Sequence, residues 1–137
     1  MTDLRILVDR YNSLVANLKA EAEYQRRADQ AHAQLAVELK NLAANNVTAA
    51  SALPGFVRAK ERHANLACAS VVEAKPHVEF VEALIARGER LGQLHLPRLQ
   101  AAVQALESVH GAYSSANRRL EASNASIREL IRTRVEP

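Results

Sequence analysis

Residues 51–57 read Ser-Ala-Leu-Pro-Gly-Phe-Val, and residues 94–99 read Leu-His-Leu-Pro-Arg-Leu. The two prolines divide the chain into three blocks, each long enough for a helix of about 60 Å at a rise of 1.5 Å per residue. Proline is tolerated in the first turn of a helix but disfavoured in its interior. We therefore interpret Pro54 and Pro97 as the corners between three rods of similar length. This arrangement predicts an all-α fold, an elongated antiparallel up-down-up three-helix bundle of the coiled-coil type.

The composition supports a helical chain without strands. The 137 residues include 26 alanines, only 4% are aromatic, and alternating β-branched runs do not occur. Alanine has the highest helix propensity, and its small side chain lets helices approach closely. With 48% apolar and 24% charged residues, the sequence is typical of a folded domain rather than of a disordered chain. We expect one helical-bundle domain that spans residues 1–137.

The helix ends are predicted from caps and breaks. Thr2 or Asp3 is a suitable N-cap, and Gly92 is a suitable C-terminal stop. Small residues predict a connection over 47–53. Pro76 interrupts the second helix, which we expect to be kinked there and otherwise continuous, with two shorter helices as the alternative. The predicted helices cover about residues 3–46, 52–91 and 97–135.

Apolar residues recur at heptad spacing in each block, as in coiled-coil seams. The first helix has rows at Leu4, Tyr11, Leu18, Gln25, His32, Leu39 and at Leu7, Leu14, Glu21, Ala28, Leu35, Leu42. The second has rows at Val57, Ala64, Val71, Val78, Ile85 and at Phe56, His63, Ser70, His77, Leu84, Leu91. The third has rows at Leu99, Leu106, Tyr113, Leu120, Ile127 and at Val103, His110, Asn117, Asn124, Ile131. We expect both rows of each helix to face the core.

These rows are apolar at both ends of each helix and polar in the middle. The polar positions are Glu21, Gln25 and His32 in the first helix, His63, Ser70 and His77 in the second, and His110, Asn117 and Asn124 in the third. We call this set the polar belt. With the helix midpoints level, we expect His32 near His63 and Asn124, Gln25 near Ser70 and Asn117, and Glu21 near Lys75 or His77.

A polar belt in a core needs a reason, because each buried polar group is costly unless it is hydrogen-bonded. One interpretation is register: polar layers select one helix alignment over its slipped alternatives. A second is that the bundle opens at the belt and a partner helix completes it. A third is a functional site, such as a pH switch built from His32, His63, His77 and His110.

The sequence has no motif that predicts catalysis or cofactor binding. Glu107 and His110 form a single E-x-x-H unit, whereas di-iron bundles use two such units and two further glutamates. Cys68, the only cysteine, lies among alanines, and we expect it to be a packed apolar residue. We therefore predict no metal, no cofactor and no enzymatic activity.

Basic residues form two clusters in a chain of net charge +3. Their members are Arg58, Lys60 and Arg62, and then Arg118, Arg119, Arg128, Arg132 and Arg134. The favoured interpretation is a solvated surface, with cations offsetting the negative end of a helix macrodipole. The alternative is a basic surface that binds nucleic acid or anionic lipid, although interleaved aromatics and glycine-rich loops are missing.

Together these features predict a non-enzymatic helical interaction module, a structural or adaptor subunit that binds other proteins through helix–helix packing or forms homo-oligomers. A secondary apolar stripe at Val8, Val15, Ala22, Ala36 and Ala43 provides additional contact surface. The alternative is a secretion or assembly chaperone that holds a helical client. No stretch is long and apolar enough to cross a membrane. We expect a cytoplasmic location by default, with an organelle or a virus particle as open alternatives.

Overall fold

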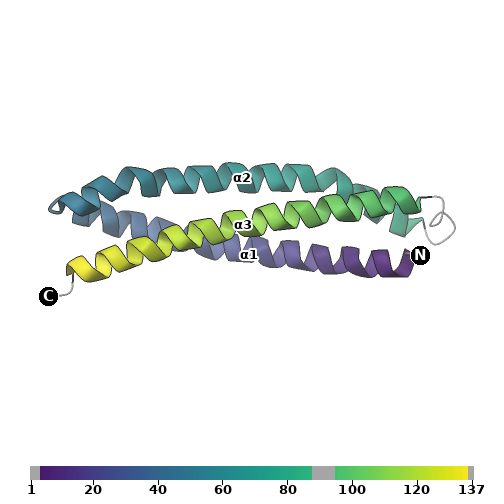
Figure 1. Cartoon of the computed structure of the whole chain (residues 1–137), viewed down its shortest axis with the longest axis horizontal. Helices are drawn as coiled ribbons and strands as arrows, with labels where there is room; N and C mark the ends of the chain where they lie inside the picture. The colour runs from purple at the N-terminus through teal and green to yellow at the C-terminus, as the bar shows by residue number, and fades with distance from the viewer. Residues whose placement is uncertain (1–3, 88–94, 136–137) are drawn as a thin grey trace.

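The chain folds into three long helices that lie side by side (Figure 1). The computed structural model describes residues 4–87 and 95–135, and within these ranges there is no strand. Helix α1 spans Leu4–Ala43, α2 spans Val47–Ala86, and α3 spans Leu96–Val135. Helix α2 runs antiparallel to α1 and α3, which places the two termini at opposite ends of the bundle. The predicted all-α, up-down-up three-helix bundle is confirmed.

The corner between α1 and α2 lies earlier than predicted. Helix α1 ends at Ala43, and α2 begins at Val47 with Asn46 as its N-cap. The Asn46 backbone is extended, with φ −138° and ψ 118°, and its side-chain oxygen accepts a hydrogen bond of 3.0 Å from the Ala49 N–H. An asparagine in this conformation satisfies one of the orphan donors of the first helical turn.

Pro54 is therefore an interior residue of α2 rather than a corner, and the predicted connection over 47–53 is helical. Proline at this position removes one backbone hydrogen bond and crowds the preceding turn. Packing on both sides offsets that cost, because Ala49 and Phe56 are buried in the same apolar cluster. Capping and burial thus outweigh the local helix-breaking tendency of proline.

Helix α2 continues through Pro76 without a break, as expected, so the alternative of two shorter helices is wrong. It ends at Ala86, where the Arg87 N–H donates to the Ala83 carbonyl over 3.2 Å. The predicted caps at Thr2 or Asp3 and the predicted stop at Gly92 lie outside the described residues.

Two apolar clusters occupy the two halves of the bundle. One consists of Leu7, Tyr11, Val81, Leu84, Leu99, Ala102, Val103 and Leu106. The other consists of Leu35, Leu39, Ala49, Phe56 and Ile127. Each cluster draws residues from all three helices, so both halves of the bundle are stabilised by apolar burial. Buried polar residues lie between them.

The packing confirms the predicted rows of α1 and α3 but corrects those of α2. The row containing His63 is buried as expected, whereas its neighbour is largely exposed: Val57 at 42%, Val71 at 58% and Ile85 at 41%. The second buried row of α2 instead contains Ala67 and Val81, with Leu53, Lys60 and Ala74 partly buried. The most hydrophobic stripe of α2 therefore faces outward, and a stripe rich in alanine faces the core.

The Asn46 cap can be tested by substitution. We expect Asn46→Ala to lower the free energy of unfolding by about 1 kcal/mol, because the Ala49 N–H loses its partner. Asn45→Ala is the matched control, since Asn45 is an exposed residue of the same turn. Chemical denaturation monitored by circular dichroism measures both. Equal effects of the two substitutions would contradict the assigned cap.

Candidate functional site

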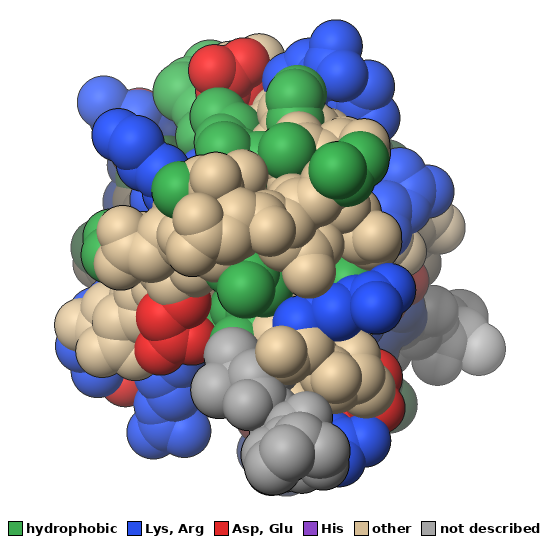
Figure 2. All heavy atoms as spheres, turned by 90° about the vertical axis from the view of Figure 1, so that its left-hand side faces the viewer, with side chains coloured by type: hydrophobic (Ala, Val, Ile, Leu, Met, Phe, Trp, Pro, Cys, Tyr) green, Lys and Arg blue, Asp and Glu red, His purple; other side chains and the backbone are tan. Residues whose placement is uncertain are grey.

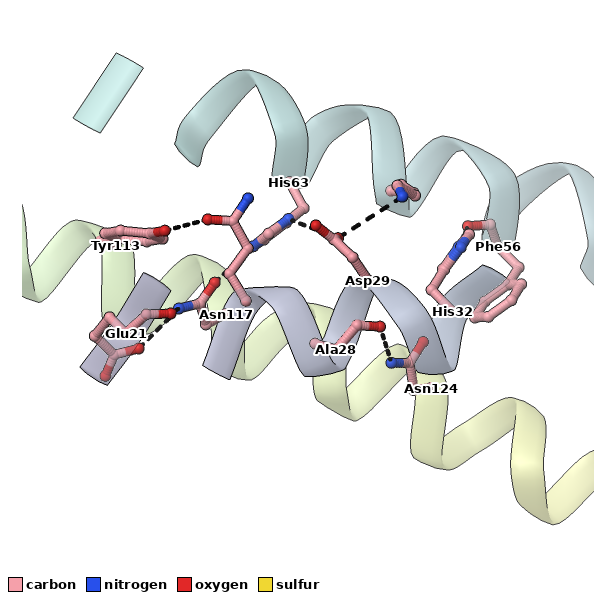
Figure 3. A network of polar contacts seen from close by, with 11 residues as sticks. Glu21, Ala28, Asp29, His32, Phe56, His63, Tyr113, Asn117 and Asn124 are labelled. Carbon is pink, nitrogen blue, oxygen red and sulfur yellow. Dashed lines mark hydrogen bonds and ion pairs between the residues drawn. The ribbon is translucent and has the colours of Figure 1, made fainter. Parts of the chain in front are cut away.

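A network of buried polar side chains lies between the two apolar clusters (Figure 3). Six residues of the predicted polar belt are buried, namely Glu21, His32, His63, Ser70, Asn117 and Asn124. The other three, Gln25, His77 and His110, are partly buried. Because most of the belt is inside the bundle, its geometry can be judged by whether each polar group has a partner.

Asn117 is the centre of this network, and its side chain is completely buried. Its amide nitrogen donates to the Glu21 carboxylate over 2.8 Å and to the Glu21 backbone carbonyl over 3.0 Å. Its amide oxygen lies 2.7 Å from Nε2 of His63. One side chain of α3 thus holds α1 and α2 at once.

These partners assign the tautomer of the His63 ring. Since the Asn117 amide nitrogen faces two acceptors, its oxygen must face His63, and Nε2 of His63 is the donor. In a neutral imidazole Nδ1 then carries no proton. Nδ1 has no hydrogen-bond partner and lies 3.8 Å from Oδ1 of Asp29, which also has none. Lys60 Nζ lies 3.9 Å from the same Asp29 oxygen.

Two further buried contacts link the helices near the network. His32 stacks on the Phe56 ring at 4.1 Å between centroids, and its Nε2 lies 2.9 Å from the Phe56 carbonyl oxygen. Asn124 donates to the Ala28 carbonyl over 3.1 Å. Every pair of helices is therefore joined by at least one buried polar contact.

The predicted alignment of the belt is wrong in register. His63 meets Asn117 rather than Asn124, a difference of one heptad between α2 and α3. Asn117 bonds Glu21 rather than Gln25, a difference of about one helical turn between α1 and α3. Gln25 instead accepts a hydrogen bond from the Tyr113 hydroxyl. The prediction aligned the midpoints of the three predicted helices. Because α2 begins and ends earlier than predicted, its midpoint lies earlier in the sequence, and this explains part of the shift.

Asp29 belongs to the network but was not among the predicted residues. It interrupts the apolar stripe of α1 one heptad after Ala22 and one heptad before Ala36. The sequence signal that could have identified Asp29 is a carboxylate within the otherwise apolar secondary stripe of α1. Ser70, which was predicted, donates within its own helix to the Leu66 carbonyl over 2.9 Å.

Two buried tyrosines extend the polar contacts beyond the belt. The Tyr11 hydroxyl donates to the Glu82 carboxylate over 2.6 Å, joining α1 to α2. Burial, reinforced by the Glu82 hydrogen bond, raises the pKa of Tyr11 above its ordinary value of 10. Burial also raises the pKa of Tyr113, with the Glu21 and Asp29 carboxylates adding to the effect.

An apolar groove of about 300 Å³ opens beside the polar network. We call it the α1–α2 groove. It is lined by Val15, Leu18, Lys19 and Ala22 of α1, Ser70, Val71, Ala74 and Val78 of α2, and Val109 and Tyr113 of α3. It exists because α3 packs closely against both other helices, while α1 and α2 contact each other least. The secondary stripe of α1 and the outward stripe of α2 meet here.

The basic clusters do not form one uniform surface. Glu21 and the Tyr24 ring approach Arg118, while Arg128 pairs with Glu121 and Arg132 with Glu129. Figure 2 looks along the bundle at the end where α1 joins α2. Lys and Arg side chains are distributed around its circumference, with hydrophobic and acidic side chains between them. Because some of these arginines are paired with carboxylates and the basic side chains at this end are dispersed, a basic surface that binds nucleic acid or lipid is less favoured.

Residues considered for metal or thiol chemistry lie apart. No group of three His, Cys, Asp or Glu side chains suited to a metal ion occurs among the described residues. Glu107 pairs with Arg10 on the surface. Cys68 is exposed, so its predicted packing in the core is wrong, because it lies on the outward side of α2 next to Val71 and Val72.

Comparison with known proteins finds no protein-family model, no curated protein and no solved structure that matches this chain. Within residues 4–87 and 95–135, none of the helices is long and apolar enough to pass through a membrane.

The Asn117 network predicts a specific loss of stability. We expect Asn117→Leu to cost about 3 kcal/mol, because it leaves the Glu21 carboxylate and His63 without their partner. Asn124→Leu is the matched control, since Asn124 is equally buried but donates only one bond, to a backbone carbonyl. We expect it to cost about 1 kcal/mol. Urea denaturation at pH 7 measures both, and equal losses would contradict the central role of Asn117.

Tyr11 predicts how stability changes at alkaline pH. Above about pH 10 the unfolded chain loses the Tyr11 proton while the folded chain keeps it, so the free energy of unfolding falls as pH rises. We expect this fall to be shallower in Tyr11→Phe than in the wild type. Tyr24→Phe, which leaves Tyr11 in place, should keep the wild-type slope. Denaturation curves between pH 9 and pH 11 decide the matter, and parallel slopes for all three proteins would refute the assignment.

Proposed function

We propose that this chain is a non-enzymatic helical interaction module, which acts as a structural or adaptor subunit by accepting a helix of another chain in the α1–α2 groove. The observation that carries the proposal is the outward stripe of α2. Val57, Val71 and Ile85 follow one another at intervals of two heptads and are 41–58% exposed, although Ala67 of the same helix is buried. Large apolar side chains exposed in a row mark interaction surfaces more often than isolated ones do.

The two walls of the groove support the same proposal. The hydrogen bond between Tyr11 and Glu82 gives one pair of facing residues from which the antiparallel register of α1 and α2 is counted. In this register Val15 lies opposite Val78 and Ala22 opposite Val71, and all four line the groove. Two parallel apolar rows separated by a shallow floor are the surface that an added helix uses in a four-helix bundle.

The buried polar network supports a rigid module. A chaperone that holds varied clients benefits from an adaptable surface, often rich in methionine. Here the groove is bordered by alanine and valine, and its floor residue Tyr113 is fixed by its hydrogen bond to Gln25. This geometry favours a defined helical partner over a changing set of clients.

The groove can be tested with paired substitutions on α2. We expect Val71→Glu to abolish co-purification of the partner from cells that produce the protein, because it places a charge in the apolar groove. Val72→Glu is the matched control, since Val72 is 66% exposed and does not line the groove. Both variants should keep the wild-type thermal melt. Retention of the same partner by Val71→Glu, or loss of it in both variants, would contradict the proposal.

A further inference from the structure

The α1–α2 groove carries positive charge that forms no ion pair within residues 4–87 and 95–135. Lys19 lines the groove, and Lys75 follows Ala74, another lining residue, by one position. Lys75 is exposed, and it precedes Val78 by three residues, which places it on the rim of the α2 wall. Among the described residues, neither lysine forms an ion pair.

The two lysines lie at the same height along the bundle. From the contact between Tyr11 and Glu82, eight residues forward along α1 reach Lys19, and eight residues back along α2 reach Ala74. The ammonium groups therefore belong to opposite rims of one level of the groove. Glu23, four residues after Lys19, pairs with Arg26. Glu79, four residues after Lys75, is exposed and forms no ion pair with it among the described residues.

From these observations, which rest on the proposed function, we propose that the occupant of the α1–α2 groove is an amphipathic helix of a different protein whose apolar stripe is flanked on both sides by Asp or Glu at the level of Lys19 and Lys75. The apolar side chains fill the groove, and the flanking carboxylates pair with the two ammonium groups. Electrostatic complementarity of this kind selects the partner and fixes its height along the groove.

The extent of the exposed row favours a helix over a compact ligand. The α2 row runs from Val57 to Ile85, which is about 42 Å of helix. A second copy of this chain fits less well. When two grooves face each other about a twofold axis parallel to the helices, Lys19 of one copy meets Lys75 of the other at the same level. Juxtaposed like charges of this kind disfavour the wrong partner.

The test uses two synthetic helical peptides of equal length and identical apolar stripe. One carries Glu at the flanking positions and the other carries Lys. Fluorescence anisotropy with the full chain at low salt should show that the Glu peptide binds about tenfold more tightly than the Lys peptide, as two exposed ion pairs allow. Lys19→Glu combined with Lys75→Glu should reverse this order. Arg119→Glu, on the exposed side of α3, is the control and should keep it.

The outcomes separate this inference from the proposed function. Equal binding of both peptides, lost in Val71→Glu, would overturn the charge inference while the groove remained a helix-binding site. Binding of neither peptide would also overturn it. Self-association of the wild type in sedimentation experiments, abolished by Val71→Glu, would identify a second copy as the occupant and overturn it as well. The proposed function itself fails on co-purification, if Val71→Glu keeps its partner or if Val71→Glu and Val72→Glu both lose it.

Discussion

The completely buried amide of Asn117 is costly unless its donors and its acceptor have partners, and Asn117 finds them on both other helices. The apolar clusters at either end do not impose this condition, because leucine and alanine pack acceptably against several alignments. Sliding one helix by a heptad would replace one apolar contact by another but would separate Asn117 from Glu21 or from His63. An uncompensated buried carboxylate then makes the slipped state costly. The polar network therefore sets the register that the apolar residues leave open.

The same constraint explains why the bundle is asymmetric. Asn117 and Asn124 both lie on α3, and α3 buries a wide face against both neighbours. Helices α1 and α2 are held to α3 more closely than to each other, which leaves the groove between them. Polar contacts between α1 and α2 lie on either side of the groove, at Tyr11 before it and at Asp29 and His32 after it along α1. The α1–α2 groove thus follows from the positions of Asn117 and Asn124, which both lie on α3.

The fold was predictable because heptad spacing and helix propensity act locally. The rows of α1 and α3 were correct because most of their large apolar side chains, such as Leu39, Leu99 and Leu106, are buried. Helix α2 failed this rule: valine marks its outward stripe, while Ala67 and Val81 face the core together with the stem of Lys60. Hydrophobicity alone cannot identify a face that is built from alanine for close approach. Pro54 misled for a different reason. The cap at Asn46 is local and starts the helix before the proline, and the burial of Ala49 and Phe56 against the other helices stabilises this early start.

Apart from Asp29, the members of the candidate site were predictable from the sequence, but their pairing was not, and the difference bears on how the groove works. Which residues are polar in an apolar row can be read from one helix. Which of them meet depends on the relative height of two helices, and a few residues of error in one corner change every pair. That height also decides whether Lys19 and Lys75 stand at one level or one heptad apart. The Asn117 network therefore orders the core and, on the proposed function, also positions the charges that a partner helix would meet. The affinity of a partner selected by those charges would therefore depend on the relative height of α1 and α2 as well as on the apolar surface of the groove.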